Sequence, residues 1–499
     1  MKHLFFVLAI TCISACSVAA QNDIDITKLK LEQLTVVSRH NVRAPLQKNV
    51  DSTYNNVESK DMLMEFTVPG SHLTERGATL ETIMGMYFRG WLKSEGLLNV
   101  YKYTIKHKQN SYSIDAVENS SFPNFYFAAS PRQRTVVSTR AFISGLLHGI
   151  SAPIYHQELE SKDPDFLPYF VTYGVGAKME EKDINKFIEK AQPEVDSIIN
   201  QYKIDLNQSY KILMDAVNYS ESKNSKWKKE FTVSGLEKEW CNKQKKDNKL
   251  KEVDLSFFRD GKIKEPEASG TLKAANQISD ALILQYLEMD EPASTGLNIP
   301  PKDSLKTWRA IADIKDIYSK ILFTAPMVAV NTSHRLLCQV KIGLDNNTFT
   351  FLCTHDTSIS ALLKALRAND YSLPESLTIE GLTPNGCKLC IEKYSLGKEY
   401  YGRVRLLYQS TKQVRNLTML DYNADKSKHP ESHPQSYNIS FEGLKCVNCN
   451  CDNCNSCRVE CEKCDNCKDG CFYKWEDLMK RIDDTIAAFA KVAKGEKPF

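Results

Sequence analysis

Arg39, His40 and Arg43 are the residues of this chain whose types and spacing are best suited to chemistry. They follow the largely apolar residues 34–37, so they stand at the end of a predicted strand. Two guanidinium groups can hold a dianion through paired hydrogen bonds. A histidine between them, with one imidazole nitrogen free, can attack the phosphorus of a bound phosphate ester. The motif therefore predicts phosphoryl transfer.

His355 and Asp356 repeat this design far downstream, after the mostly apolar residues 349–353. A second histidine would hold the phosphate, and a carboxyl group would protonate the departing oxygen. Either motif by itself is more often a surface pair or a helix cap. Because both motifs follow predicted strands, and ligands of open α/β sheets bind at the strand ends, we expect them to form one site.

With these two motifs the chain resembles the histidine acid phosphatases, whose signature is Arg-His-Gly-x-Arg-x-Pro followed much later by His-Asp. Asn41, where most members have glycine, and the stretch 155–158 make the likeness greatest to the periplasmic glucose-1-phosphatase and phytase group. Other segments match the family in order, namely Leu73–Gly77, Met86–Arg89, Ala129–Thr135, Thr383–Gly386, Val404–Leu406 and Tyr408–Thr411.

The resemblance implies a role for each residue of the site. His40 would be the nucleophile that forms a phosphohistidine, and Asp356 the acid that protonates the leaving group and then activates water. No metal ion and no cofactor is expected, because arginines neutralise the charge that magnesium neutralises elsewhere. The phosphate oxygens would be bound by Arg39, Arg43, Arg134 and His355.

Apolar periodicity predicts an α/β fold with a mostly parallel central sheet flanked by helices, and with an inserted helical domain. In residues 30–150, apolar runs alternate with helical patterns, whereas strand signals are few between 155 and 330. Helices are predicted at residues 79–92, 139–147, 183–202, 272–287, 304–322, 358–366 and 474–492.

These patterns predict the domain boundaries. The parts are a signal peptide (1–20), the first part of the α/β core (21–154), the inserted helical domain (155–335), the second part of the core (336–421), a linker (422–440), a cysteine-rich segment (441–473) and a C-terminal helix (474–499).

The N-terminal residues 1–20 have the basic start, short apolar run and small-residue end of a secretory signal. We therefore expect a secreted or periplasmic protein, with a lipid anchor at Cys16 as the alternative. No apolar run is long enough to span a membrane. The net charge is +3 with both signs interspersed, which does not suggest nucleic-acid binding.

Nine of the 16 cysteines lie between Cys446 and Cys471. In an exported chain such a cluster favours a disulfide knot, although its paired C-x2-C spacings also suit zinc. The family resemblance implies that Cys446 and Cys471 pair, whereas Cys387 and Cys390 are close enough to pair with each other or with distant partners. The cysteine-rich segment is a candidate surface for a partner or for self-association.

The sequence thus predicts an exported acid phosphatase that hydrolyses small phosphomonoesters, either sugar phosphates or phytate. Two alternatives remain open. One is a catalytically idle phosphate-binding protein whose cysteine-rich segment binds a partner. The other is a phosphotransferase like the phosphoglycerate mutases, which share the catalytic histidine design.

Overall fold

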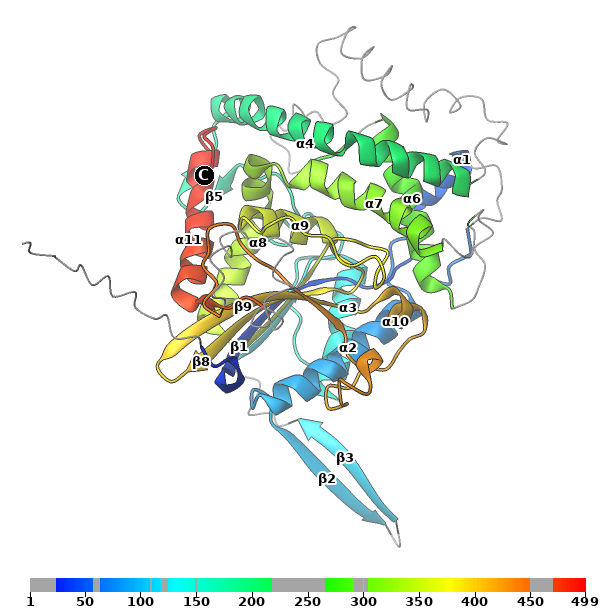
Figure 1. Cartoon of the computed structure of the whole chain (residues 1–499), viewed down its shortest axis with the longest axis vertical. Coiled ribbons are helices and arrows are strands. Elements are labelled where there is room, and N and C mark those ends of the chain that lie inside the picture. Colours follow the sequence, from blue (N-terminus) through cyan, green and yellow to red (C-terminus); the bar gives the residue numbers. More distant parts are fainter. Residues whose placement is uncertain are drawn as a thin grey trace, which may run out of the picture.

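A seven-stranded sheet forms the centre of the protein and has helices on both faces (Figure 1). Its strands are β1 (Lys30–Arg39), β4 (Phe125–Ala129), β7 (Phe349–Thr354), β8 (Lys388–Leu396), β9 (Glu399–Tyr408), β10 (Gln435–Asn438) and β11 (Tyr473–Lys474). The computed structural model describes residues 24–56, 63–107, 110–117, 124–148, 150–217, 265–268, 270–290, 299, 304–448 and 470–499.

The strand order is β10-β9-β8-β1-β7-β4, with β11 also paired to β9. β1 and β4 both pair with β7 in parallel, whereas the other pairings are antiparallel. β1, β4, β7 and β9 consequently run in the same direction. Arg39 is in register with Thr354, and Ala129 with Cys353, so the three parallel strands end at one edge of the sheet. The predicted helix-flanked α/β fold is confirmed.

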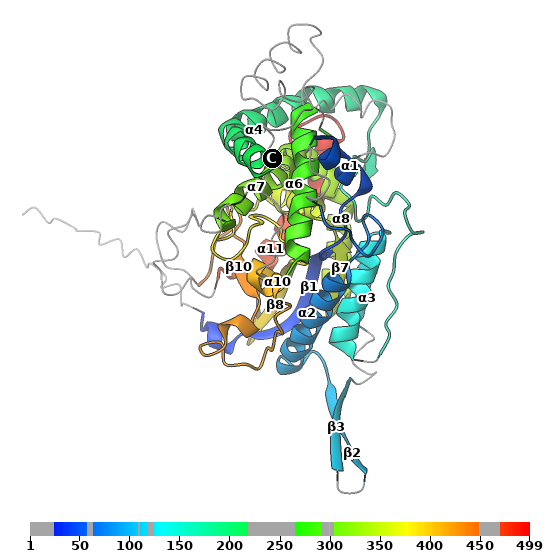
Figure 2. The ribbon, with the colours of Figure 1, turned by 90° about the vertical axis from the view of Figure 1, so that its right-hand side faces the viewer.

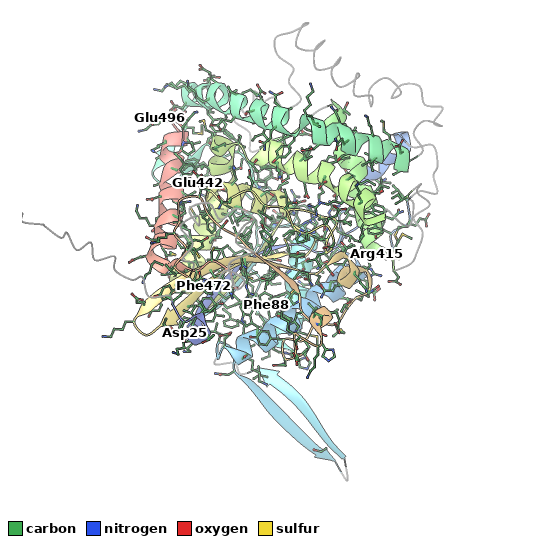
Figure 3. The ribbon with its side chains drawn as sticks, viewed as in Figure 1. Asp25, Phe88, Arg415, Glu442, Phe472 and Glu496 are labelled. Atoms are coloured by element: carbon green, nitrogen blue, oxygen red, sulfur yellow. The ribbon has the colours of Figure 1, made fainter. Side chains whose placement is uncertain are left out.

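Helices α2 (Glu75–Ser94) and α3 (Gln133–Leu147) cover one face of the sheet. Phe88 and Phe472 both lie in this layer (Figure 3). The two helices approach so closely that a Cβ added at Gly85 would lie 2.2 Å from the carbonyl oxygen of Phe142. The other face is covered by α8 (Pro326–Asn346), α9 (Asp356–Ala365) and α11 (Trp475–Val492).

A group of helices with its own apolar core lies beyond α9 (Figures 1 and 2). It comprises α1 (Gln47–Asn56), α4 (Glu181–Ala216), α6 (Gly270–Glu288) and α7 (Ser304–Phe323). Helix α8 runs through the boundary expected between residues 335 and 336. Val328 and Val330, before that boundary, pack in the helical core, whereas Leu336 and Leu337 pack against the sheet.

The prediction that residues 422–440 form a linker is wrong. Within this range β10 pairs with β9 and forms an edge of the sheet. His433 is buried, and Gln413 donates hydrogen bonds to the carbonyl oxygens of Glu431 and His433. The polar, proline-containing composition suggested a loop, but an edge strand as short as β10 needs few apolar side chains.

The described ends of the cysteine-rich segment also belong to the sheet layer. Cys446 and Cys471 are buried in the apolar core, and the backbone N–H of Val447 donates to the carbonyl of Phe472 at 2.8 Å. The predicted C-terminal helix is confirmed as α11, which packs on the core through Leu478 and other apolar residues. The pairing of Cys446 with Cys471 stays a prediction.

For Cys387 and Cys390 the sequence left open a pairing with each other or with distant partners, and the structure shows neither. Both thiols are buried and free, and the two residues belong to apolar clusters on opposite faces of the sheet, because they stand three positions apart along an extended chain.

A hairpin of β2 (Val100–His107) and β3 (Asn110–Val117), which the sequence patterns did not predict, projects away from the body (Figure 2).

Several predictions lie outside the described residues: the signal peptide at 1–20, the lipid anchor at Cys16 and the cysteines between 449 and 469. Among the helices of the described ranges, none is both long and apolar enough to cross a membrane.

Candidate active site

The predicted site residues meet at the edge where the three parallel strands end. His40 follows β1, and its backbone N–H donates to the carbonyl of Thr354, the last residue of β7. His355 and Asp356 come next on that side, as the cap and first residue of α9. Arg134 lies in the first turn of α3, just after β4. The rings of His40 and His355 stand edge to face with 5.3 Å between their centroids.

His40 is buried and set up as a neutral nucleophile. Its Nδ1 lies 2.8 Å from the carbonyl oxygen of Asn41. Since a carbonyl only accepts hydrogen bonds, Nδ1 carries the proton and Nε2 keeps its lone pair. Burial, together with the positive charges of Arg134, Arg43 and Arg39, holds the pKa of His40 well below its ordinary value of 6.5. The ring therefore stays uncharged even in mildly acidic solution.

His355 is engaged at both ring nitrogens. An N–H of Arg134 donates to Nδ1 at 3.4 Å, so Nε2 carries the proton and donates to the hydroxyl of Ser130 at 3.0 Å. Burial and the positive charge of Arg134 hold the pKa of His355 well below 6.5. Ser130 was not among the residues predicted for the site.

Arg134 is a guanidinium with no ion-pair partner among the described residues. Its Nε also has no hydrogen-bond partner there. Burial and repulsion from Arg43 and Arg132 lower the pKa of Arg134 to about 9, from an ordinary 12.5. A bound anion would stabilise this buried guanidinium, since the anion supplies a negative charge and hydrogen-bond acceptors.

Arg39 and Arg43 are instead held by buried carboxylates that the sequence patterns did not reveal. Nη1 of Arg39 lies 2.6 Å from Oε1 of Glu380, and Nη2 of Arg43 lies 3.0 Å from Oδ2 of Asp280. Burial alone would lower the pKa of Arg39, but Glu380 and Asp356 outweigh it and raise the pKa above its ordinary value. These pairs fix where the two guanidinium groups point.

Asp356 has a partner that was also missed, Lys315 of α7. Its Nζ lies 2.7 Å from Oδ2 of Asp356 and 3.8 Å from the nearest carboxylate oxygens of Asp280 and Glu380. Burial would raise the pKa of Asp356, but Lys315 and Arg39 outweigh it and hold the pKa well below 3.8. The acid implied by the resemblance is therefore ionised in this arrangement.

A fully buried ion pair lies next to Asn41, the residue that follows His40. Nζ of Lys388 is 2.8 Å from Oε1 of Glu81 in this pair. The side-chain amide of Asn41 donates to the same Glu81 oxygen at 3.0 Å. Gly386 lies against this amide, because a Cβ there would come within 2.2 Å of Asn41 Nδ2. Asn41 thus ties the backbone next to His40 to the buried pair.

The structure brings together all six predicted site residues. It also places four further polar or charged side chains beside them that no motif indicated, namely Ser130, Asp280, Lys315 and Glu380. Asp280 and Lys315 lie in helices of the inserted part, and single charged residues in an amphipathic helix look like its solvated face. Among the described residues, no group of three or more metal-ligating side chains occurs.

The sequence matches the family model of the histidine phosphatase superfamily (branch 2) over residues 30–409. It is 29% identical to a glucose-1-phosphatase of Salmonella typhimurium over 435 residues, covering 84% of this chain and 91% of that protein. It is 27% identical to a glucose-1-phosphatase of Providencia rettgeri (78% and 83% covered) and 23% identical to the phytase AppA of Escherichia coli (79% and 84% covered).

Solved structures show the same fold. The phytase of Citrobacter braakii superposes with a TM-score of 0.62 at 20% identity, covering 91% of this chain and 98% of that one. The predicted family is therefore confirmed: the chain belongs to branch 2 of the histidine phosphatase superfamily and is a phosphomonoester hydrolase of the histidine acid phosphatase type.

Proposed function

We propose that this protein is an exported acid phosphatase that hydrolyses sugar phosphates through a phosphohistidine on His40. The observation that carries the proposal is the position of Arg134. This guanidinium forms no ion pair with a described residue and lies beside His355, whose ring faces His40. An anion bound there would place its central atom next to a neutral imidazole nitrogen.

In the first step Nε2 of His40 attacks phosphorus and the bond to the leaving oxygen breaks. Arg39, Arg43 and Arg134 stabilise the charge on the other phosphate oxygens, which is the main source of rate in phosphoryl transfer. Asp356 gives a proton to the departing alkoxide, so the leaving group departs as an alcohol. In the second step Asp356 takes a proton from water, whose oxygen displaces His40 from phosphorus.

The charges next to Asp356 favour a neutral, hydroxyl-bearing leaving group. Lys315 contacts the carboxylates of Asp280, Asp356 and Glu380. Arg43 pairs with Asp280 and Arg39 pairs with Glu380, so the charges of this cluster balance. Carboxylates accept hydrogen bonds from sugar hydroxyls, and a cluster whose charges balance offers no surplus positive charge to further phosphate groups. We therefore place sugar phosphates before phytate as the substrate class, in line with the glucose-1-phosphatase relatives.

The nucleophile is tested by trapping. Enzyme mixed with a labelled phosphate ester and quenched in alkali should carry phosphate on the peptide that contains His40, and His40→Ala should carry none and be inactive. The matched control is His156→Ala, because His156 is exposed and hydrogen-bonded only to the carbonyl of Gln157 among the contacts described. Labelling of the His40→Ala protein would refute the assignment.

The substrate class is tested by comparing kcat/KM on glucose 1-phosphate, inositol hexakisphosphate and p-nitrophenyl phosphate. We expect glucose 1-phosphate to exceed inositol hexakisphosphate. The reverse order would favour a phytase. A catalytically idle binding protein would release no phosphate from p-nitrophenyl phosphate, and a mutase-like enzyme would transfer phosphate between sugars faster than to water.

Export remains part of the proposal. It rests on the signal-like residues 1–20. The two possible routes are simple secretion and a lipid anchor at Cys16. Expression of the full chain followed by analysis of the N-terminus of the mature protein distinguishes them, since cleavage after Ala20 would fit secretion and a lipid-modified Cys16 would fit anchoring.

A further inference from the structure

Lys315 contacts Asp356, the proposed general acid, although it belongs to neither sequence motif. It lies on α7, and its side chain is 14% exposed. Its ammonium group sits among three carboxylates that come from three different segments, namely Asp280 of α6, Asp356 of α9 and Glu380 of the chain before β8. The shortest of these contacts, 2.7 Å, is the one to Asp356.

We propose that Lys315 is a positioning residue of the phosphatase reaction, which holds the Asp356 carboxylate at the phosphate pocket and keeps it ionised until a substrate brings the proton. The proposal rests on the function proposed above. It assigns the helical insertion a part in the chemistry itself, because α7 is the element that supplies the ammonium group.

The surroundings of Asp356 support this role. A carboxylate that touches an ammonium and a guanidinium group loses its tendency to hold a proton. Nη2 of Arg39 is 3.6 Å from Oδ2 of Asp356, farther than Lys315. Several charged and titratable groups from other elements also act on or with Asp356. They are Lys315 on α7, Arg39 at the end of β1 and His40 just after it, Arg134 on α3, Asp280 on α6, His355 before α9, Glu380 and Cys387 before β8, and Glu265.

This arrangement determines where the catalytic proton comes from. Phosphate monoesters keep one proton below about pH 6, so the substrate can enter as a monoanion. That proton passes from a phosphate oxygen to the Asp356 carboxylate, which leaves the ester as a dianion among the arginines. As the bond from His40 to phosphorus forms and the ester bond breaks, Asp356 returns the proton to the leaving oxygen.

The second half of the cycle restores the starting charges. Water gives a proton to Asp356 while its oxygen bonds to phosphorus and the bond to His40 breaks. Asp356 then passes this proton to the hydrogen phosphate dianion, which departs as dihydrogen phosphate. The cycle thus consumes one ester monoanion and one water, and it yields one alcohol and one dihydrogen phosphate. An acidic optimum follows, since only the monoanion brings the proton.

The test is the pH dependence of kcat/KM for glucose 1-phosphate in Lys315→Met. Without the ammonium group, Asp356 should keep its own proton at higher pH. The alkaline limb of the pH profile should therefore shift to higher pH by about one unit. On p-nitrophenyl phosphate, whose leaving group needs little protonation, the limb should move less. Lys315→Arg should restore the wild-type profile.

Lys320→Met is the matched control on the same helix. Nζ of Lys320 contacts the hydroxyl of Tyr202 at 3.2 Å and forms no described contact with Asp356, so the profile should not change. In an Asp356→Asn background Lys315→Met should cause no further shift, since interacting residues are not additive. A uniform loss at every pH, with both limbs unmoved in a folded protein, would refute the proposal.

A second measurement does not depend on turnover. Calorimetric binding of inorganic phosphate should persist to higher pH in Lys315→Met than in the wild type, for the same reason. Lys315→Gln serves if the methionine variant does not fold. If the wild type releases no phosphate from any ester, the proposed function fails, whereas the binding curves still decide the role of Lys315.

Discussion

The site has two halves that differ in how they are held. The phosphate half stands on parallel strand ends and includes His40, His355 and Arg134, the last of which forms no ion pair with a described residue. In the leaving-group half, Lys315 lies between the carboxylates of Asp280 and Asp356, and Asp280 also pairs with the phosphate-binding Arg43. One half is left open for an anion, and the other is already neutralised. This difference implies that the phosphate is recognised by charge and the leaving group mainly by hydrogen bonds.

Among variants that keep the nucleophile, Asp356→Asn should show the largest effect, because Asp356 joins the two halves. We expect turnover of glucose 1-phosphate to fall by about 10²–10⁴-fold, the usual contribution of a general acid, and p-nitrophenyl phosphate to lose much less. Steady-state kinetics on both esters decide this. Equal losses on the two substrates would remove Asp356 from the role of acid.

Arg134→Met should reduce kcat on both substrates alike, by about 10²–10³-fold, because it removes one stabilising donor whatever the leaving group is. Arg132→Met is a control from the preceding turn, since Arg132 is paired with Glu160 at the surface. A loss that depended strongly on the leaving group would contradict the division of the site into two halves.

Lys388→Met should test what supports the phosphate half. It leaves Glu81 buried without its partner, which typically costs about 3–5 kcal/mol of stability. Chemical denaturation should show this loss. The double variant Lys388→Met/Glu81→Leu removes both charges and should recover much of it. No loss in the single variant would show that the pair does not hold the backbone at Asn41.

The smallest predicted effect is on stability, and it concerns Asp316, which binds the backbone next to Glu380 in the leaving-group half. Asp316 of α7 accepts a hydrogen bond from the N–H of Gly381 at 2.7 Å, and burial together with Asp313 raises its pKa to about 7. Because the folded pKa exceeds the ordinary 3.8, the fold favours the protonated form, and stability falls as pH rises from about 4 through 7.

Asp316→Asn should therefore gain melting temperature relative to the wild type at pH 8 but little at pH 4. Thermal melts across this range measure the difference. Asp484→Asn is the control, as Asp484 is exposed and pairs with Lys480. A gain that did not change with pH would mean that Asp316 is not protonated in the fold.

The same contrast explains what could be predicted from the sequence. His40 and His355 stand shortly after largely apolar runs that predict strands, so their shared edge followed from the topology of α/β sheets. Lys315 and Glu380 could not be found in this way, because each is one charged residue whose importance depends on packing between distant segments. The strand β10 was missed because its composition is that of a loop, and only its pairing with β9 makes it a strand.

The hydrogen bond between Val447 and Phe472 has a consequence for protein engineering. Asn448 reinforces it, since its side chain accepts from the N–H of Phe472 and donates to the carbonyl of Gly470. Asn448 and Gly470 are therefore held next to each other by the surrounding sheet. The entropy of closing a loop grows only slowly with its length. A foreign domain or an affinity tag spliced between Asn448 and Gly470 would thus join two ends that the fold already holds together.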